Sequence, residues 1–178
     1  MRIIGGVHKG KTIHPPKGLI LRPTTDFAKE ALFNILNNKV EFKDLEVLDL
    51  FCGVGGISLE FGSRGSKIHS VDENYNCLKF VKATADELKM DLSVTKADVF
   101  KFLPKETKQY DLIFADPPYN LPNIDQINQL VMQQNLLKEG GILIIEHGPK
   151  TDLSELPYFF EHRKYGNVNF SFFTFTKV

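Results

Sequence analysis

From residue 46 onward, short apolar runs alternate with stretches of helical periodicity. The apolar runs cover 46–51, 67–72, 92–97, 110–116 and 140–147, and the helical stretches cover 56–64, 75–90, 99–103 and 124–137. Strands that alternate with helices form a parallel sheet with helices on both faces and right-handed crossovers. Ligands bind such a sheet where its strands end. The alternation therefore predicts a doubly wound α/β fold with its site at the strand exits.

The first 38 residues lie ahead of this alternation. Residues 1–23 are rich in Gly, Pro and Lys and contain no acidic side chain, which predicts a small basic β-hairpin or arm. The stretch 24–38, TTDFAKEALFNILNN, has helical periodicity, with Phe27 first among the apolar side chains of its predicted inner face. Thr24 or Thr25 can cap the amino end of this helix.

The pattern changes again after residue 147. Two β-rich runs, 158–166 and 167–178, meet at a Gly-Asn pair, which predicts a terminal β-hairpin. We expect residues 46–178 to form a catalytic core that includes this hairpin. A chain of 178 residues is long enough for one well-buried core, so 1–178 is expected to be a single domain.

Composition excludes several classes of protein. Charged residues make up 25% and hydrophobic residues 42% of the chain, as in ordinary globular domains. No apolar run has the length of a membrane span, and the start MRIIGGVHKGK lacks the apolar segment of a signal peptide. Cys52 and Cys77 make neither a disulfide framework nor a metal cluster, and the scattered histidines predict no metal site. These features predict a cytoplasmic protein.

The first strand exit carries a Gly-rich turn, DLFCGVGG, from Asp49 to Gly56. Gly53 and Gly55 remove side chains where a backbone can approach a ligand closely. A dinucleotide-binding fingerprint, G-x-G-x-x-G, would also need glycine at position 58, where the chain has Ser58. The turn is therefore only a weak indication of a nucleotide-type cofactor.

Acidic residues follow the second and third strands. Asp72, with Glu73 as second choice, lies about twenty residues beyond the Gly-rich turn and can accept hydrogen bonds from a ribose diol. A nicotinamide cofactor and an S-adenosyl cofactor would both use such an acid. At the third exit, Asp98 can accept from an adenine amino group and the Val99 backbone can donate to the ring. For an isolated Asp at this position, a helix cap is the favoured role.

The fourth strand ends in DPPY, residues Asp116, Pro117, Pro118 and Tyr119. The prolines end the strand. Asp116 and a carbonyl of the proline pair can accept the two hydrogens of an exocyclic amino group, and Tyr119 offers a face for stacking of the base. Two such acceptors favour a pyramidal nitrogen whose lone pair points toward an electrophile. The motif therefore predicts transfer chemistry at a planar amino group.

Four segments in this order, VLDLFCGVGGISLE, VDEN, KADVF and FADPPY, resemble the class I S-adenosylmethionine-dependent methyltransferases that act on amino groups. The segments RIIGGVHKGKTI and LRPTTDFAKEALFNIL, with the C-terminal hairpin, resemble more closely the bacterial 16S ribosomal RNA guanine-N2 methyltransferases of the RsmD type. This resemblance covers almost the whole chain. It implies a Rossmann-like, seven-stranded, mostly parallel sheet with an antiparallel last strand. It also implies S-adenosylmethionine as methyl donor and one guanine of small-subunit rRNA as acceptor.

The resemblance also assigns roles to individual residues. The methionine part of the cofactor would contact Asp49, Phe51, Gly53 and Gly55. Its ribose would contact Asp72 or Glu73, and its adenine would contact Asp98 and Val99. Thr24 would lie on the outer side of the cofactor. The target base would enter the pocket of Asp116, Pro117, Pro118 and Tyr119. The charge of the basic segment, rather than the resemblance, assigns RNA contacts to Arg2, Lys9, Lys11 and Arg22, and Thr25 is expected beside them. Arg22, Thr24 and Thr25 can instead belong to a simple helix cap.

The expected partner is 16S rRNA within the small ribosomal subunit or an assembly intermediate, bound by a monomer without any membrane contact. Three alternatives stay open. A DNA adenine-N6 methyltransferase would use the same DPPY motif, but usually carries a separate recognition domain. An NAD-dependent oxidoreductase is opposed by Ser58 and by the lack of an identifiable hydride-transfer residue. A catalytically silent RNA-binding module is disfavoured because both motifs are intact.

Overall fold

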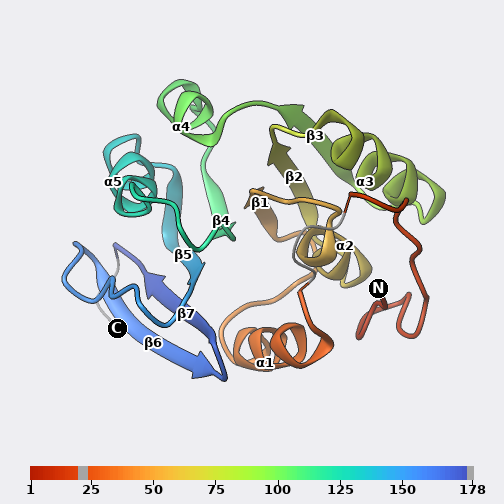
Figure 1. The fold of residues 1–178 in the computed structure, drawn as a ribbon, viewed down its shortest axis with the longest axis horizontal. Coiled ribbons are helices and arrows are strands. Elements are labelled where there is room, and N and C mark those ends of the chain that lie inside the picture. The colour runs from red at the N-terminus through yellow and green to blue at the C-terminus, as the bar shows by residue number, and fades with distance from the viewer. Residues whose placement is uncertain (20–23, 176–178) are drawn as a thin grey trace.

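Strands from most of the chain join in one seven-stranded sheet in the order β3-β2-β1-β4-β5-β7-β6 (Figure 1). The structure is a computed structural model that describes residues 1–19 and 24–175. The strands are β1 (Glu46–Leu50), β2 (Lys67–Asp72), β3 (Leu92–Lys96), β4 (Tyr110–Ala115), β5 (Leu137–His147), β6 (Phe159–Tyr165) and β7 (Val168–Phe173). The helices are α1 (Asp26–Asn37), α2 (Gly56–Ser63), α3 (Tyr75–Glu87), α4 (Val99–Phe102) and α5 (Asp125–Gln133), with a 3-10 turn at Leu103–Lys105.

The sheet has the predicted directions. Strands β1 to β5 pair in parallel, whereas β7 is antiparallel to both β5 and β6. The prediction of a mostly parallel sheet with an antiparallel last strand is therefore confirmed. We call the edge at which β1 to β5 end the carboxyl edge. In β7, Asn169 pairs with His147 of β5 on one side and Lys164 of β6 on the other, so Tyr165 also lies at the carboxyl edge.

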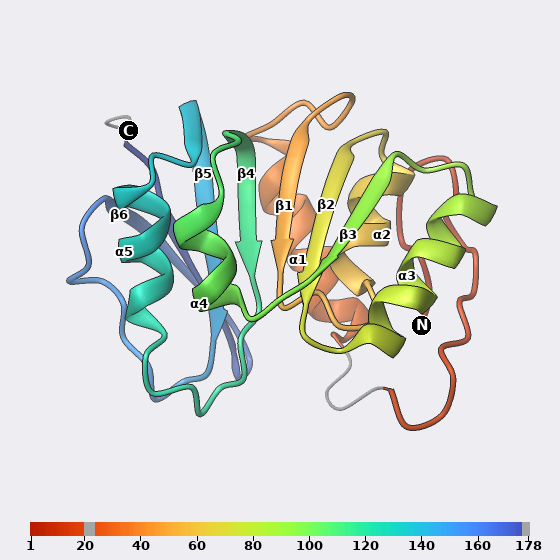
Figure 2. The ribbon, with the colours of Figure 1, turned by 90° about the horizontal axis from the view of Figure 1, so that it is seen from above.

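Helices cover both faces of the sheet. Side chains of α1, α2 and α3 pack with one set of strand residues that includes Val47 and Leu112. Side chains of α4 and α5 pack with the alternate set, which includes Leu48 and Ile113. Figure 2 shows α4 and α5 in front of the sheet and α1 behind it. Because the central strands are covered on both faces, they read as continuous apolar runs in the sequence.

The N-terminal arm forms a minimal hairpin. Arg2 and Thr12 make an isolated antiparallel bridge, next to a hydrogen bond from the backbone N–H of Ile3 to the Lys11 carbonyl at 2.9 Å. The turn packs on the carboxyl-terminal end of α2, where the N–H of Val7 donates to the Ser63 carbonyl at 2.8 Å. Figure 2 shows this turn at the edge of the sheet opposite the carboxyl edge. The buried side chain of Ile3 ties the arm to the core of α1 and α2.

Two predicted helices are too long. Helix α3 was expected to reach Met90 but ends at Glu87, and α5 was expected over 124–137 but ends at Gln133. Lys89 and Asn135 adopt left-handed backbone angles, with φ of 57° and 52°, which end the helical path. The apolar pattern continues beyond each helix because the following side chains are also buried.

The predicted inner face of α1 is wrong at its first turn. Phe27 was expected to be buried but is 64% exposed, whereas Lys29 is 1% exposed. The Lys29 ammonium donates to the Arg2 carbonyl at 2.6 Å and forms an ion pair with Glu60 of α2 at 3.1 Å. Arg64 also contacts Glu60, at 2.6 Å. A buried charge is tolerated when it is paired in this way, and this network joins the arm, α1 and α2.

Candidate active site at the carboxyl edge

Three carboxylates lie at neighbouring strand exits. Asp49 is the fourth residue of β1, Asp72 ends β2, and Asp116 directly follows β4. Because β1 lies between β2 and β4, these exits meet at the centre of the sheet. The N–H of Asp116 donates to the Leu50 carbonyl at 3.3 Å, which fixes its backbone against β1. We call Asp49, Asp72 and Asp116 the acid cluster.

Asp49 is the most buried member of the acid cluster, at 1% exposure. The Ser58 hydroxyl donates to Asp49 Oδ2 at 2.5 Å and lies 2.7 Å from the Ser70 hydroxyl. Burial raises the pKa of Asp49 to about 7; the hydrogen bond from Ser58 opposes this shift, and the nearby charges of Asp116 and Asp72 add to it. The serine that departs from the dinucleotide fingerprint thus has a role: it is the hydrogen-bond partner of Asp49.

Two backbone N–H groups hold Asp72, one from the Gly-rich turn and one from the segment just after β2. The N–H of Gly53 donates to Asp72 Oδ2 and the N–H of Asn74 to Asp72 Oδ1, both at 2.9 Å. Gly53 and Gly55 have left-handed φ values of 54° and 85°. A side chain on Gly55 would collide with Val81, 2.8 Å away, whereas one on Gly53 would meet nothing within 4 Å. The turn is therefore packed on its inner side and open on the side of Gly53.

The third exit forms an aromatic wall next to this turn. Asp98 caps α4, accepting from the N–H of Phe100 at 2.7 Å and of Lys101 at 3.3 Å. The side chain of Val99 is buried, which leaves its backbone for any contact with a ligand. The Phe51 ring, on a backbone with φ of 59°, meets the Phe100 ring edge-on at 6.4 Å between centroids. Phe100 was not among the predicted site residues, although it directly follows the KADV segment.

In the fourth exit, Pro117 is buried, Asp116 and Tyr119 are half-buried, and Pro118 is exposed. A side chain on Gly148 would lie 2.7 Å from Tyr119 Cδ2, so the Tyr119 ring rests against the Gly148 backbone just beyond β5. From the sequence alone, strand-end packing is enough to explain this glycine, and no chemistry is predicted for it. Its signal was its position, at the exit of the strand next to β4.

Buried polar groups support Gly148 from behind. The His147 Nδ1 lies 3.0 Å from the Gly148 carbonyl, and its Nε2 lies 2.8 Å from the Ser171 hydroxyl of β7. Burial lowers the pKa of His147, which favours the neutral ring. A neutral imidazole that donates from Nδ1 to the carbonyl can accept from the serine at Nε2. This arrangement fixes the backbone on which the Tyr119 ring rests.

The residues predicted to meet RNA do not gather at the acid cluster. Thr25 caps α1, accepting from the N–H of Ala28 at 3.1 Å, and Arg2 pairs with Asp26 at 3.1 Å. Lys9 and Lys11 are exposed on the arm, near the turn that lies at the opposite edge of the sheet. The remaining site residues predicted from the sequence are Thr24, which is half-buried before α1, Glu73, which is exposed after β2, and Arg22, which lies outside the described residues.

The arrangement suits a ligand that carries positive charge and a diol. The acid cluster favours a cation, and each oxygen of Asp72 can accept a further hydrogen bond from a hydroxyl. The same cluster disfavours a pyrophosphate, because like charges in a partly buried site repel strongly. Within residues 1–19 and 24–175, no group of three or more His, Cys, Asp and Glu side chains could hold a metal ion. In the same ranges, no helix is long and apolar enough to cross a membrane.

Comparisons with known proteins identify the family and its relatives. The family model described as conserved hypothetical protein 95 matches residues 1–174. The ribosomal RNA small subunit methyltransferase D of Buchnera aphidicola is 31% identical over 148 residues, which cover 82% of this chain and 75% of that protein.

Two solved structures from Thermus thermophilus share the fold. The hypothetical protein TTHA0928 has a TM-score of 0.84 at 24% identity, covering 97% of this chain and 98% of its own. The 16S rRNA N2 G1207 methyltransferase, in complex with AdoMet and guanosine, has a TM-score of 0.70 at 20% identity. That match covers 88% of this chain and 45% of the other. At these identities, the two structures establish the fold alone.

Proposed function

The chain belongs to the conserved hypothetical protein 95 family, and from this premise we propose that it is an S-adenosylmethionine-dependent 16S rRNA methyltransferase. The acceptor is the exocyclic N2 amino group of a guanine. The Buchnera relative is a small subunit rRNA methyltransferase by name, and a structure of the same fold holds AdoMet and guanosine. The observation that carries the proposal is the acid cluster beside the DPPY motif, at adjacent exits of one parallel sheet.

The Gly-rich turn and the first three exits fit the cofactor. S-adenosylmethionine, when bound, supplies an electrophilic methyl group on a positively charged sulfur. Asp49 and Asp72 would hold its cationic methionine part and its ribose diol, with Gly53 as the open side of the turn. Asp98 and the Val99 backbone would face its adenine, and the Phe51–Phe100 pair would close the apolar side of the ring. The positive charge of the ligand would also favour the ionised form of Asp49.

The DPPY motif would hold the target guanine. Asp116 would accept one hydrogen of the amino group, and the Pro117 carbonyl would accept the other. Tyr119, backed by Gly148, would stack on the base and exclude water from one face. Holding both hydrogens would direct the nitrogen lone pair toward the methyl group. The N–C bond would form as the S–C bond breaks, which leaves a neutral thioether, and the proton lost from the nitrogen would pass to the Asp116 carboxylate. Catalysis by position and electrostatics is enough for this step.

The rival functions fit less well. A dinucleotide would bring its pyrophosphate toward the acid cluster, which opposes an NAD-dependent oxidoreductase. A DNA adenine-N6 methyltransferase shares the DPPY chemistry, but the Buchnera relative, whose match covers 82% of this chain, is an rRNA enzyme by name. A silent RNA-binding module would not need a buried Asp49 that accepts a hydrogen bond from Ser58 and lies near Asp116.

The physiological substrate is 16S rRNA within the small ribosomal subunit or an assembly intermediate, bound by a monomer in the cytoplasm. A flipped base needs surrounding shape for recognition, and a particle supplies more shape than a short hairpin. Lys9 and Lys11 are proposed to meet phosphates outside the immediate target site, and Thr24 to lie on the outer side of the cofactor.

Radiolabelled methyl transfer to small subunits from cells that lack the enzyme tests the function. We expect label in 16S rRNA that digests to N2-methylguanosine, with subunits methylated faster than a short hairpin of the target sequence. Genomic DNA from the same cells is the matched control and should stay unlabelled. Label in N6-methyladenine of DNA, or no transfer to any rRNA, would contradict the proposal.

A further inference from the structure

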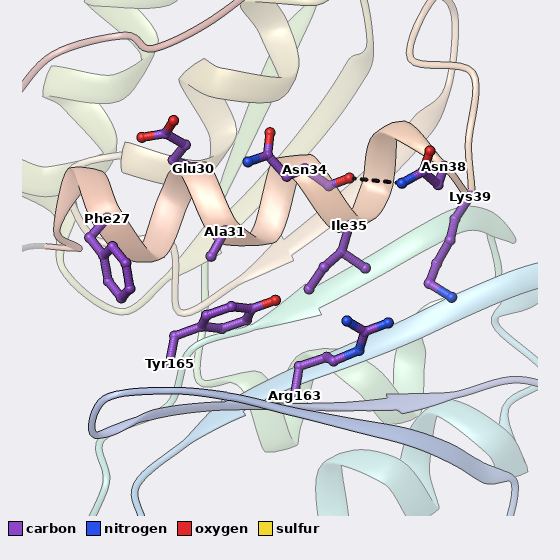
Figure 3. A pocket seen from close by; sticks show the side chains of 9 residues that line it. All are labelled: Phe27, Glu30, Ala31, Asn34, Ile35, Asn38, Lys39, Arg163 and Tyr165. Atoms are coloured by element: carbon purple, nitrogen blue, oxygen red, sulfur yellow. Dashed lines mark hydrogen bonds between the residues drawn. The ribbon is translucent and has the colours of Figure 1, made fainter.

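A groove runs between α1 and the C-terminal hairpin, on the face of the sheet that α1 covers (Figure 3). It has a volume of about 660 Å³. We call it the α1–β6 groove. Its lining residues are Phe27, Glu30, Ala31, Asn34, Ile35, Asn38 and Lys39 from α1 and the residues just after it, and Arg163 and Tyr165 from β6.

One end of the groove lies at the carboxyl edge. Phe27 is in the first turn of α1 and Tyr165 ends β6, and their rings meet edge-on at 6.2 Å between centroids. Tyr165 lies level with the exit of β5, which adjoins the exit of β4 that carries DPPY. The other end is marked by the ion pair of Lys39 with Glu161 at 3.2 Å. An extended ligand in the groove would therefore run from the active-site rim across the sheet.

At the near end the Phe27 ring is available to a flat ligand, and the half-buried Tyr165 ring lies beside it. Phe27 is 64% exposed, an unusual state for a phenylalanine in the first turn of a helix that packs on a core. In Figure 3 the Phe27 side chain points from α1 toward the hairpin, and the Tyr165 side chain lies along the groove beneath α1. Exposed aromatic faces beside a backbone-binding groove are the means by which proteins stack single-stranded bases.

The walls supply cations for a phosphate backbone. The Arg163 side chain is 48% exposed, and Figure 3 shows its guanidinium pointing toward α1. Glu161 contacts both Arg163, at 2.9 Å, and Lys39, at 3.2 Å. One carboxylate shared by two cations orients them and leaves one of their two positive charges uncompensated. Asn34 and Asn38 add amide groups on the α1 wall, where Glu30 is the acidic residue.

The other side of α1 extends this charge. A second cavity, of about 490 Å³, lies between α1 and the arm and shares Glu30 and Asn34 with the α1–β6 groove. Arg2 and Lys9 line it. Basic side chains therefore stand on both sides of the exposed face of α1. This distribution favours a polyanion over an apolar protein segment as the occupant of the groove.

We infer that the α1–β6 groove binds a single-stranded segment of the rRNA next to the target guanine. Bases stack on Phe27 and Tyr165, and phosphates meet Arg163 and Lys39. This inference rests on the proposed function and names the surface that delivers the substrate to it. It assigns a role in RNA recognition to residues that are far from the acid cluster in sequence.

Two matched pairs of variants test the inference. Arg163→Ala is compared with Lys164→Ala, which removes the same charge from the neighbouring residue of β6, on the other face of the strand. Phe27→Ala is compared with Tyr158→Ala, which removes a similarly exposed ring from an edge-on pair with Phe175, just before β6 begins. Binding of a labelled single-stranded 16S fragment is measured by anisotropy at several salt concentrations. S-adenosylmethionine affinity, measured by calorimetry, monitors the folded active site.

We expect Phe27→Ala and Arg163→Ala each to weaken RNA binding by about tenfold, the scale of one lost stacking or charged contact. Arg163→Ala should also reduce the slope of log affinity against log salt by about 1, the value for one lost phosphate contact. The matched controls should change RNA affinity less than about twofold, and all four variants should keep the affinity for S-adenosylmethionine.

Equal RNA affinity in each variant and its control would overturn the inference, while rRNA methylation by the wild-type chain would keep the proposed function intact. Sedimentation could instead show that the wild type is a dimer and that the groove variants are monomers with unchanged RNA binding. The groove would then be an interface between copies, and this result would also overturn the inference. A wild-type chain that methylates no rRNA would overturn both the inference and the proposed function.

Discussion

The acid cluster gathers carboxylates, whereas the α1–β6 groove presents two cations beside one acid, although the chain as a whole has a formal net charge of zero. Asp49, Asp72 and Asp116 converge at the centre of the carboxyl edge, whereas Lys39 and Arg163 line the groove that leaves this edge along α1. A cationic cofactor and a polyanionic substrate need opposite fields, so one neutral chain can serve both by separating them. Net charge alone hides this division.

The two regions also differ in how their side chains are held. Asp49 accepts from Ser58, and Asp72 accepts from two backbone N–H groups, so both carboxylates are fixed before a ligand arrives. In the groove, Phe27 and Arg163 are exposed and can adjust to a ligand. We expect variants of the acid cluster to affect cofactor and turnover strongly, and variants of the groove to affect RNA alone.

The largest effect should follow from Asp116→Ala. Loss of an aligned hydrogen-bond partner in the transition state should lower turnover by at least about 10²-fold, roughly 3 kcal/mol. S-adenosylmethionine binding should stay nearly intact, because Asp116 is assigned to the amino group. Single-turnover methyl transfer and calorimetry measure the two effects, with Asp116→Asn as the variant of similar size. Near-normal transfer by Asp116→Ala would show that the amino group is held elsewhere.

Asp72→Ala should act on the cofactor. We expect S-adenosylmethionine binding to weaken by about 1.5 to 3 kcal/mol, the range for hydrogen bonds to a charged group. Calorimetry of the wild type and the variant measures this difference. The wild type should show no measurable NADH binding, and tighter binding of NADH than of S-adenosylmethionine would remove the basis for the acid cluster as a methyl-donor site.

Gly148→Ala tests the contact between the Tyr119 ring and the backbone of Gly148. The new methyl group would lie 2.7 Å from Tyr119 Cδ2, so the ring must move. We expect kcat/KM to fall by about tenfold, since a small misplacement of a positioning group is costly. Cofactor affinity should not change. In a Tyr119→Ala background the same glycine substitution should have little further effect, and two fully additive losses would show that Gly148 acts on something else.

A smaller, pH-dependent effect should arise from Asp49. Its pKa of about 7 means that the carboxyl is mostly protonated at pH 6 and mostly ionised at pH 8. The ionised form attracts a cationic cofactor, so S-adenosylmethionine affinity should rise with pH across this window by on the order of 1 kcal/mol. Calorimetry at pH 6, 7 and 8 follows the change. In Asp49→Asn the affinity should be independent of pH in this window, and an equal slope in both proteins would point to another titrating group.

The sequence predicted the fold and the acid cluster for a shared physical reason. Strand periodicity is local, and the exits of parallel strands must meet at one edge, so Asp49, Asp72 and Asp116 could be placed together without a structure. The position of Ser58 opposite Asp49 could not be predicted, because it depends on how α2 lies over β1. The departure from the dinucleotide fingerprint was visible in the sequence, but its cause was not.

The groove escaped prediction because it is made by segments distant in sequence. Helical periodicity placed Phe27 on the inner face of α1 and gave no reason to bury Lys29. In the structure Phe27 is exposed, and partners from the arm and from α2 bury Lys29. Tyr165 and Arg163 meet α1 only through the β6–β7 hairpin. The role of Gly148 was hidden in the same way, since the Tyr119 ring that rests on it comes from another strand exit.

The separation of cofactor and RNA is tested most directly by one crossed measurement. The affinities of wild type, Asp72→Ala and Arg163→Ala are measured for S-adenosylmethionine and for the single-stranded 16S fragment in the same buffer. We expect Asp72→Ala to weaken the cofactor alone and Arg163→Ala to weaken the RNA alone. If either folded variant binds both ligands more weakly to the same extent, the two regions form one site, and the separation of cofactor binding from RNA binding is contradicted.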